Sequence, residues 1–338
     1  IKPTPTVKAG ELTLTEGTDY VLTYGENINA GNGSVTITAN PESNYSFDKG
    51  VTNFPILQRK VKISGIQAED KIYDGSTAAA LVYSGVVFDG KLAEDELTLT
   101  AAGTFRTADA SETEARVVDL SNLTLGGRDK DNYAIDATYS QWTASAYIRR
   151  ATLYVTGTAQ AAATYGTQVK DIEIRGLVVT LPTAGGTVAV DGSWKFSSTD
   201  KPNAGNTTAY TATFEPTNGA ENYNVLTRRI VPTITPAKGK DLGTATISLT
   251  YADTGTKTYK PDWSGLPGDQ HWEYSCGASV RLPEYSIKAD GSELTYAIPA
   301  DSKSGDRITL TLTASCSNYE DYTWTLLLEI TDRLPQPD

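Results

Sequence analysis

The sequence predicts an all-β protein made of tandem β-sandwich domains, and two observations carry this prediction. Apolar residues alternate with threonine in several short runs, as at residues 97–100 and 310–313. A period of two is typical of half-buried antiparallel strands. An Asn-Tyr dipeptide also recurs four times, each time followed by an isoleucine and then a basic residue, the last of which is Arg333. A repeat of this length indicates an array of similar domains.

The spacing of this Asn-Tyr repeat predicts where the domains begin and end. Successive repeat tyrosines lie 88, 90 and 96 residues apart, at Tyr45, Tyr133, Tyr223 and Tyr319. The sequence therefore predicts four modules, at residues 1–58, 59–150, 151–237 and 238–338. The first module is truncated, because only 44 residues precede its repeat tyrosine. The junctions carry no Gly/Ser-rich linker, so we expect an extended array of modules placed end to end.

Within each module we expect strands joined by tight turns. Gly, Asn and Asp cluster between the alternating runs, as at residues 29–33, and these residue types supply the positive φ of tight turns. The favoured fold is an immunoglobulin-like β-sandwich. The alternative is a β-grasp-like module, in which a helix packs on a sheet. That alternative needs residues 91–96 to form a helix, since no other stretch of the second module keeps a helical period.

Charge and composition argue against several partners. The chain carries 29 basic and 41 acidic residues, a formal net charge of −12, whereas nucleic acids and anionic lipids attract basic surfaces. The self-repelling surface favours a monomer. No apolar run reaches the ~18 residues of a membrane span, so we expect no membrane insertion within this segment. The chain begins without methionine or a signal-peptide pattern, which favours a piece of a longer protein.

The second module carries a resemblance in several segments that occur in a fixed order. These segments are KIYDGSTA at residues 71–78, DELTL at 95–99, LTLG at 123–126 and DNY at 131–133. The stretch from about residue 60 to residue 150 resembles the YDG-type repeat of large bacterial surface proteins. It departs from that repeat at residues 107–116 (TADASETEAR), where the family has a shorter turn.

The flanking modules resemble related repeats. Residues 14–20 and 24–31 of the first module are similar to a repeat of Gram-positive surface proteins. Residues 164–166 and 203–205 of the third module are similar to modules that often stand beside YDG repeats. The resemblance implies all-β adhesin or stalk modules outside the cell, at the bacterial surface. It implies no catalytic residues.

We interpret the repeat tyrosines as structural. A tyrosine near a strand start can bury its ring between two sheets while its hydroxyl bonds a nearby backbone group, as in the tyrosine corner of sandwich domains. The asparagine before it suits a turn. We therefore expect core residues rather than ligand contacts at Tyr45, Tyr133, Tyr223 and Tyr319.

The two cysteines favour a structural disulfide. Cys276 shares the apolar face of residues 272–276, and Cys316 shares the apolar face of residues 308–316. Two inward cysteines 40 residues apart suit a bridge between sheets in an exported protein. The alternative is a pair of buried free thiols.

The densest aromatic and polar patch is the second site hypothesis. Trp263, His271 and Trp272 lie in PDWSGLPGDQHWEY, the stretch least like the other repeats. Exposed aromatics of this kind would bind carbohydrate, whereas the simpler interpretation is that the tryptophans fill the core of the fourth module. His271 is the one histidine of the chain, and no nucleophile has a motif around it, so we expect no enzyme.

Two further chemistries have weak signals. Asp129 and Asp131 cluster oxygens at a loop, which is a weak calcium signal because the full spacing of a calcium loop is missing. No other cofactor is indicated. Lys62 and Lys71 are candidates for lysine–asparagine cross-links, which require a buried carboxylate beside both groups.

The sequence therefore predicts a non-catalytic stalk or spacer segment of a bacterial cell-surface protein. The alternative is a module that binds carbohydrate or a host or matrix protein through its C-terminal unit. The repeat and the lack of converging polar residues favour the spacer.

Overall fold

The computed structural model describes residues 1–138, 140–253 and 255–332, and it confirms the all-β class. In these ranges the chain forms strands β1 to β30 and three 3-10 turns of three residues each. The 3-10 turns are η1 (Lys130–Asn132), η2 (Val169–Asp171) and η3 (Ala220–Asn222). The basic residue predicted to end the last repeat, Arg333, lies outside the described residues.

The chain divides into two compact units. The first comprises Ile1–Thr152 together with Glu221–Asn224, and the second comprises Leu153–Ala220 together with Val225–Asp338. Each sheet in the described residues takes its strands from one of the four predicted modules. The module boundaries themselves stay a prediction.

The first module has one three-stranded antiparallel sheet and a short hairpin. The sheet order is β3-β4-β5, and the hairpin pairs β1 with β2. The strand bounds are Lys8–Ala9 for β1, Leu12–Thr13 for β2, Tyr20–Tyr24 for β3, Gly31–Ala39 for β4 and Gly50–Ile56 for β5. Leu14, Tyr20 and Val35 are the most buried apolar residues of this module's first three dozen positions.

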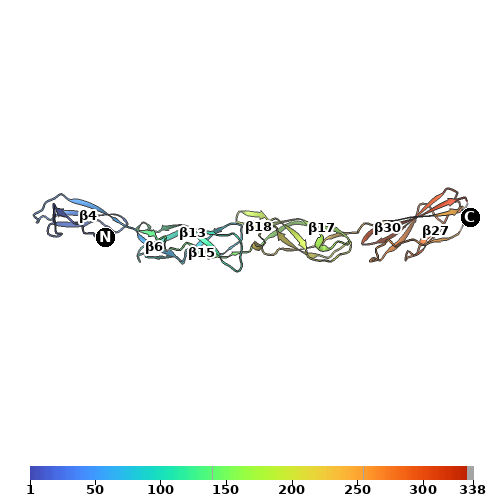
Figure 1. Ribbon diagram of the computed structural model, residues 1–338, viewed down its shortest axis with the longest axis horizontal. Coiled ribbons are helices and arrows are strands. Elements are labelled where there is room, and N and C mark those ends of the chain that lie inside the picture. Colours follow the sequence, from blue (N-terminus) through green and yellow to red (C-terminus); the bar gives the residue numbers. More distant parts are fainter. Residues whose placement is uncertain (139, 254, 333–338) are drawn as a thin grey trace. The chain divides into compact units, whose positions relative to one another are not determined.

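The second module is a two-layered sandwich. One layer has the order β15-β13-β12-β9, and the other has the order β11-β6-β14. Side chains from both layers, including Ile63, Phe105 and Val118, meet in one buried cluster. Figure 1 shows β13 and β15 side by side, as their antiparallel pairing requires. The strand β14 runs parallel to β6.

The strands of the second module have the following bounds. The first layer contains β9 (Ala78–Ala79), β12 (Thr98–Phe105), β13 (Arg116–Gly126) and β15 (Thr143–Ala146). The second contains β6 (Arg59–Ser64), β11 (Val87–Asp89) and β14 (Tyr133–Ile135). Two short pairs complete the module, β7 (Gln67–Ala68) with β10 (Leu81–Val82), and β8 (Lys71–Ile72) with β16 (Ile148–Arg149).

The β-grasp alternative is wrong for this module. Residues 91–96 form a turn and not a helix. Lys91 holds that turn, because its Nζ donates to the backbone oxygens of Leu92 at 3.0 Å and Asp95 at 2.6 Å. These acceptors are three positions apart, and a turn of this length is too short to be a helix that could cover a sheet.

The third module also packs two sheets. One sheet has the order β19-β18-β17-β23 and the other has the order β20-β21-β22. Buried residues come from both, including Val179 and Leu181 on β18 and Trp194 and Phe214 on the second sheet. The bounds are β17 Tyr154–Thr164, β18 Ile174–Thr183, β19 Gly186–Ala189, β20 Gly192–Phe196, β21 Tyr210–Pro216, β22 Thr227–Ile230 and β23 Thr233–Thr235.

The fourth module packs two sheets around a buried core. Its sheets have the orders β24-β30-β29-β26 and β25-β28-β27, and β24 runs parallel to β30. Leu294 and Tyr296 from one sheet pack with Leu310 and Leu326 from the other. The bounds are β24 Asp241–Thr250, β25 Lys257–Tyr259, β26 Glu273–Ala278, β27 Glu284–Ile287, β28 Leu294–Ala297, β29 Arg307–Cys316 and β30 Tyr319–Thr331.

Candidate functional site

The asparagine of the repeat binds a loop that lies far earlier in the chain. Asn132 Oδ1 accepts the backbone N–H of Ala30 at 2.8 Å, and Asn132 Nδ2 donates to Asn29 Oδ1 at 3.0 Å. One side-chain amide therefore uses both its acceptor and its donor on two consecutive residues. We call this contact an Asn clasp.

The same clasp forms at the next two copies of the repeat. Asn222 accepts from the N–H of Ala110 at 2.7 Å and donates to Asp109 Oδ1 at 3.4 Å, within the first unit. In the second unit, Asn318 accepts from the N–H of Ala204 at 2.9 Å and donates to Asn203 Oδ1 at 3.1 Å. In all three clasps the partner is an Asn-Ala or Asp-Ala pair.

Burial makes these hydrogen bonds matter. Asn222 is 3% exposed and Asn318 is 5% exposed, whereas Asn132 is half-buried. A buried amide left without partners costs roughly 1–3 kcal/mol, so the loop residues are held where the amide needs them. The accepted N–H lies 102, 112 or 114 residues before the asparagine. Each clasp therefore ties the Asn-Tyr segment of one module to a loop of the module before it.

The clasped loop is itself anchored by the isoleucine of the repeat. The residue after the alanine donates its backbone N–H to the backbone oxygen of that isoleucine. The distance is 2.8 Å from Ser111 to Ile148 and 3.0 Å from Gly205 to Ile234. Gly205 has a φ of +74°, a conformation that favours glycine. The isoleucine that follows each Asn-Tyr thus positions the loop that the next Asn-Tyr binds.

Sequence reasoning missed this partner loop. Residues 107–116 stood out as a departure from the YDG-type repeat, yet they contain Asp109 and Ala110, which the clasp of Asn222 uses. The signal was present as an Asn-Ala or Asp-Ala pair in three modules. Without coordinates, nothing linked it to the Asn-Tyr dipeptide.

The repeat tyrosines are only partly as predicted. Tyr133 is 3% exposed, as predicted for a core residue. Its hydroxyl donates to Asp95 Oδ2 at 2.5 Å and accepts from the backbone N–H of Leu92 at 3.0 Å. Burial and the hydrogen bond to Asp95 raise the pKa of Tyr133. Tyr45, Tyr223 and Tyr319 are half-buried. At Tyr223 and Tyr319 the buried residue is the preceding asparagine, whereas Asn44, before Tyr45, is exposed.

Two of the half-buried tyrosines pack edge-on against another tyrosine. Tyr223 meets Tyr73 of the YDG segment, with ring centroids 5.5 Å apart, and Tyr319 meets Tyr165, with centroids 5.4 Å apart. Such edge-to-face pairs add about 0.5–1.5 kcal/mol beyond area burial. The tyrosines at positions 73 and 165 thus support the same joint as the clasp.

The predicted disulfide is wrong in this structure. Cys276 and Cys316 are free, and both lie in one sheet, on neighbouring strands β26 and β29. Cys276 is opposite Leu312, so the cysteines are offset by four residues, or about 13 Å along the strands. That offset exceeds the reach of a disulfide. Burial raises the pKa of the Cys276 thiol to about 11.

The aromatic patch supports the core interpretation. Trp272 is 8% exposed, and Trp263 packs against the buried clusters of the fourth module. Both indole N–H groups donate inward, from Trp263 to the oxygen of Gly291 at 2.9 Å and from Trp272 to the oxygen of Pro267 at 3.0 Å. His271 is exposed.

Asp129 and Asp131 were the weak calcium signal of the sequence. Among the described residues, no group of three His, Cys, Asp or Glu side chains is placed to hold a metal ion. Asp129 instead accepts the N–H of Glu96 at 2.8 Å and pairs with Arg128 at 3.0 Å. Asp131 is exposed in η1.

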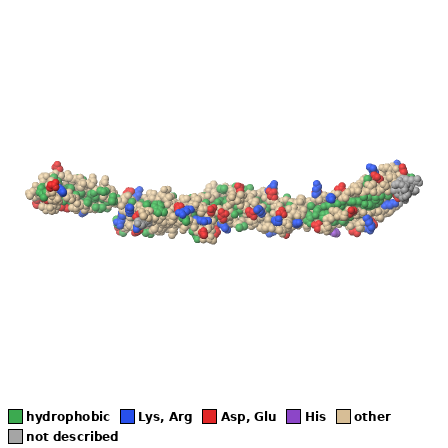
Figure 2. Space-filling view, in the orientation of Figure 1, with side chains coloured by type: hydrophobic (Ala, Val, Ile, Leu, Met, Phe, Trp, Pro, Cys, Tyr) green, Lys and Arg blue, Asp and Glu red, His purple; other side chains and the backbone are tan. Residues whose placement is uncertain are grey.

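The two cross-link candidates have other partners. Lys71 Nζ lies 2.7 Å from Asp74 and donates to Ser76, and Lys62 lies 3.9 Å from Asp89. Among the described residues, the partners of Lys71 are Asp74, Ser76 and Ala78, none of which is an asparagine. Charged side chains of both signs are scattered over the face shown in Figure 2, so the net negative charge does not gather into one patch there.

Comparison with protein families matches one part of the chain. The family model of the YDG domain matches residues 58–141. These residues form a YDG domain. The YDG domain supplies Asn132 to one clasp and the Asp109-Ala110 pair to another. No curated protein matches the sequence. None of the helices in the described residues is long and apolar enough to cross a membrane.

Several solved structures made of tandem domains are similar at low scores. A titin I-band fragment has a TM-score of 0.30 at 10% identity and covers 82% of this chain and 99% of its own. Drosophila N-cadherin EC1-4 has a TM-score of 0.27 at 9% identity and covers 89% of this chain and 83% of its own. The immunoglobulin domains 1–4 of Sidekick-1 have a TM-score of 0.24 at 9% identity, with the same coverage of 89% and 83%.

Proposed function

We propose that this chain is a non-catalytic spacer, or stalk, segment of a bacterial cell-surface protein. The observation that supports the proposal most directly is the recurrence of the Asn clasp at Asn132, Asn222 and Asn318. A spacer needs its consecutive modules to stay connected in a defined way. A clasp serves this need because it adds buried hydrogen bonds to a short covalent junction.

The side chains that could carry chemistry are used structurally. Several carboxylates with lowered pKa values pair with neighbouring residues, as Asp109 does with Thr107 and Asn222. The YDG domain at residues 58–141 supports placement in a large surface protein. The Gram-positive origin and the extracellular setting belong to this proposal.

Antibodies raised against the full chain test the proposed location. Applied to intact cells of the species that encodes the protein, they should label the surface without permeabilisation. Labelling only after permeabilisation would contradict the proposal.

Arrays of glycans and matrix proteins test the alternative, in which the fourth module binds a ligand. Saturable retention of one glycan or protein by the full chain would favour that alternative.

A further inference from the structure

The first and last strands of the fourth module run side by side in the same direction. Residues Thr244–Thr250 of β24 lie opposite Thr325–Thr331 of β30 without a break, and Asp241 lies opposite Thr323 ahead of one register shift. Because β24 is the first strand of this module and β30 is the last, the chain enters and leaves the module through one pair of parallel strands. We call this pairing the terminal ladder.

In the second and third modules the corresponding pairing is divided into short pieces. In the second module β14 pairs with β6 over three residues and β16 pairs with β8 over two, both in parallel. In the third module Ala151 bridges Tyr223, and β23 pairs with Ala162–Thr164 of β17. In the fourth module Ala237 bridges Tyr319, the first residue of β30, and β30 then runs uninterrupted through the whole ladder.

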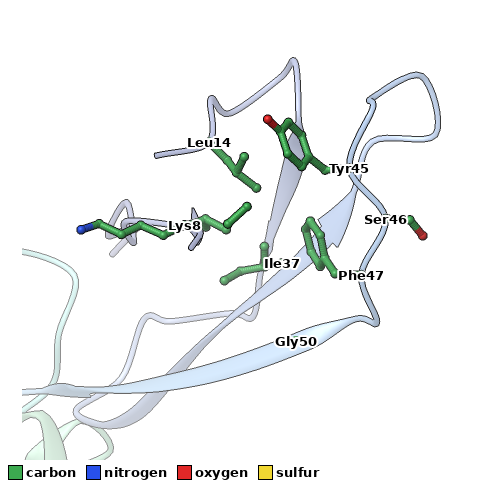
Figure 3. A pocket seen from close by; sticks show the side chains of 9 residues that line it. Lys8, Leu14, Ile37, Tyr45, Ser46, Phe47 and Gly50 are labelled. Atoms are coloured by element: carbon green, nitrogen blue, oxygen red, sulfur yellow. The ribbon is translucent and has the colours of Figure 1, made fainter. Parts of the chain in front are cut away.

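The first module offers no comparison, because no strand of the described residues pairs with Tyr45. Figure 3 shows Tyr45 and Phe47 turned toward Leu14 and Ile37, and these four residues line a mainly apolar cavity. The terminal ladder is therefore compared among the three later modules.

Parallel terminal strands determine how a module responds to tension. When the two ends of the chain are pulled, β24 is pulled toward its N-terminal end and β30 toward its C-terminal end. Since the paired strands are parallel, these forces act along the strands in opposite directions and load all the hydrogen bonds of the ladder together. Strands pulled apart from one shared end would instead lose their hydrogen bonds one after another. Forced unfolding is governed by the unfolding rate, and this rate is lower where more bonds must break in one step.

Side chains add to the resistance against sliding. Leu249 is 7% exposed, and Leu326 and Leu328 are fully buried in the core between the two sheets. A shift of β24 by one residue would turn its inward side chains toward solvent. On its other side, β30 pairs with β29 from Arg307 to Ala314. The strand that must slide is therefore β24, which lies at the edge of the sheet.

We propose that the fourth module resists tension more strongly than the second and third modules, and that its terminal ladder is the cause. Under tension applied to the two ends of the chain, the second and third modules unfold before the fourth. The use of this property in the cell rests on the proposed spacer function. The property itself is measured on the purified chain, so it can fail while surface labelling succeeds, and the reverse.

The first test loads the fourth module in two directions and leaves its fold unchanged. Lys240 and Asp321 are exposed at the same end of the ladder, where the N–H of Thr323 donates to the oxygen of Lys240 at 3.0 Å. Asp332 is exposed at the opposite end. Azide-bearing residues placed at these positions of the full chain carry the handles for optical tweezers, so that both cysteines stay as they are.

Handles at positions 240 and 332 load the ladder along its strands, whereas handles at 240 and 321 separate the strands from one end. At the same loading rate we expect an unfolding force about twofold or more higher for the first pair of handles. Equal forces for the two pairs of handles, or a higher force for the second pair, would overturn the proposal.

The second test pulls the full chain from its two ends. An insertion of about 20 Gly/Ser residues between the exposed Val280 and Arg281 lengthens the unfolding step of the fourth module by about 70 Å and so identifies it. The first module is shorter, so its step is recognised by its size. The lengthened step should follow those of the second and third modules and occur at a higher force. A lengthened step that precedes either of them would contradict the proposed order.

Discussion

The amide oxygen of Asn318 accepts the backbone N–H of Ala204 at 2.9 Å, across 114 residues of sequence. The same pair of atoms meets between Asn132 and Ala30 at 2.8 Å. A dipeptide that marks the period of the sequence is therefore one half of a contact, and the Asn-Ala or Asp-Ala pair is the other half.

The clasps should differ in their response to a negative charge. Asn222→Asp would place a carboxylate against Asp109, whereas Asn132→Asp would face the neutral amide of Asn29. Both variants lose one donor, but only the first adds repulsion between like charges. We expect Asn222→Asp to destabilise the first unit by about 1 kcal/mol more than Asn132→Asp, measured by thermal unfolding of the full chain at pH 7.

Acid should reduce this difference. In the native chain, hydrogen bonds from Thr107 and from Asn222 lower the pKa of Asp109. In Asn222→Asp the two facing carboxyls share a proton once the pH falls toward about 4, so the repulsion disappears. Equal destabilisation by the two variants at pH 7 would show that Asp109 does not face position 222.

Stability in acid should depend on Asp253. Hydrogen bonds from Lys257 and from the N–H and hydroxyl of Thr250 lower the pKa of Asp253 to about 2. Because this value lies below the unfolded value of about 3.9, the stabilisation is complete above about pH 4 and is lost as the pH falls toward 2. Asp253→Asn should therefore destabilise the second unit at pH 7, with a smaller effect at pH 2 in calorimetry. An effect that does not change with pH would contradict this assignment.

Both cysteines should be found as thiols. The mass of the intact protein should be the same with and without reductant, whereas a disulfide would remove two hydrogens. At pH 8 only about one Cys276 in a thousand should be thiolate, given a pKa of about 11. We therefore expect Cys276 to react slowly with a disulfide reagent in the folded chain and rapidly after denaturation. Rapid reaction of Cys276 in the folded chain would contradict its half-buried position.

Two tryptophans form a matched pair for testing buried hydrogen bonds. Trp194 and Trp272 are both 8% exposed, but the indole N–H of Trp194 has no partner among the described residues, whereas that of Trp272 donates to Pro267. Trp272→Phe should cost about 1–2 kcal/mol more than Trp194→Phe, because it leaves the carbonyl of Pro267 unpaired. Equal costs in denaturant unfolding would mean that the indole hydrogen bonds contribute little.

Much of the fold was predictable because alternation is a local signal. The runs at residues 97–100 and 310–313 lie in or beside β12 and β29, and the predicted inward residues Leu310 and Leu312 are fully buried. The phase of Cys316 on β29 was also predicted. Its pairing was not, because alternation shows which face a residue takes and says nothing of which sheet or register its neighbour takes.

The candidate site was harder to predict, because its two halves are distant in sequence. The turn role assigned to the repeat asparagine holds locally, since η1 ends at Asn132 and η3 ends at Asn222. Its side chain, however, is satisfied by residues about 100 positions away. The edge-on contact of Tyr73 with Tyr223 is equally non-local. Composition and spacing within one module carry no information on such partners.

Hydrogen exchange at the three alanines of the clasped loops tests the central claim most directly. The amides of Ala30, Ala110 and Ala204 should exchange slowly in the full chain. Asn132→Ala, Asn222→Ala and Asn318→Ala should each speed exchange about tenfold or more at the partner alanine alone. The control Asn40→Ala, whose amide bonds the oxygen of Gly17, should change none of them. Fast exchange at these alanines in the unaltered chain, or no response to the substitutions, would contradict the clasp.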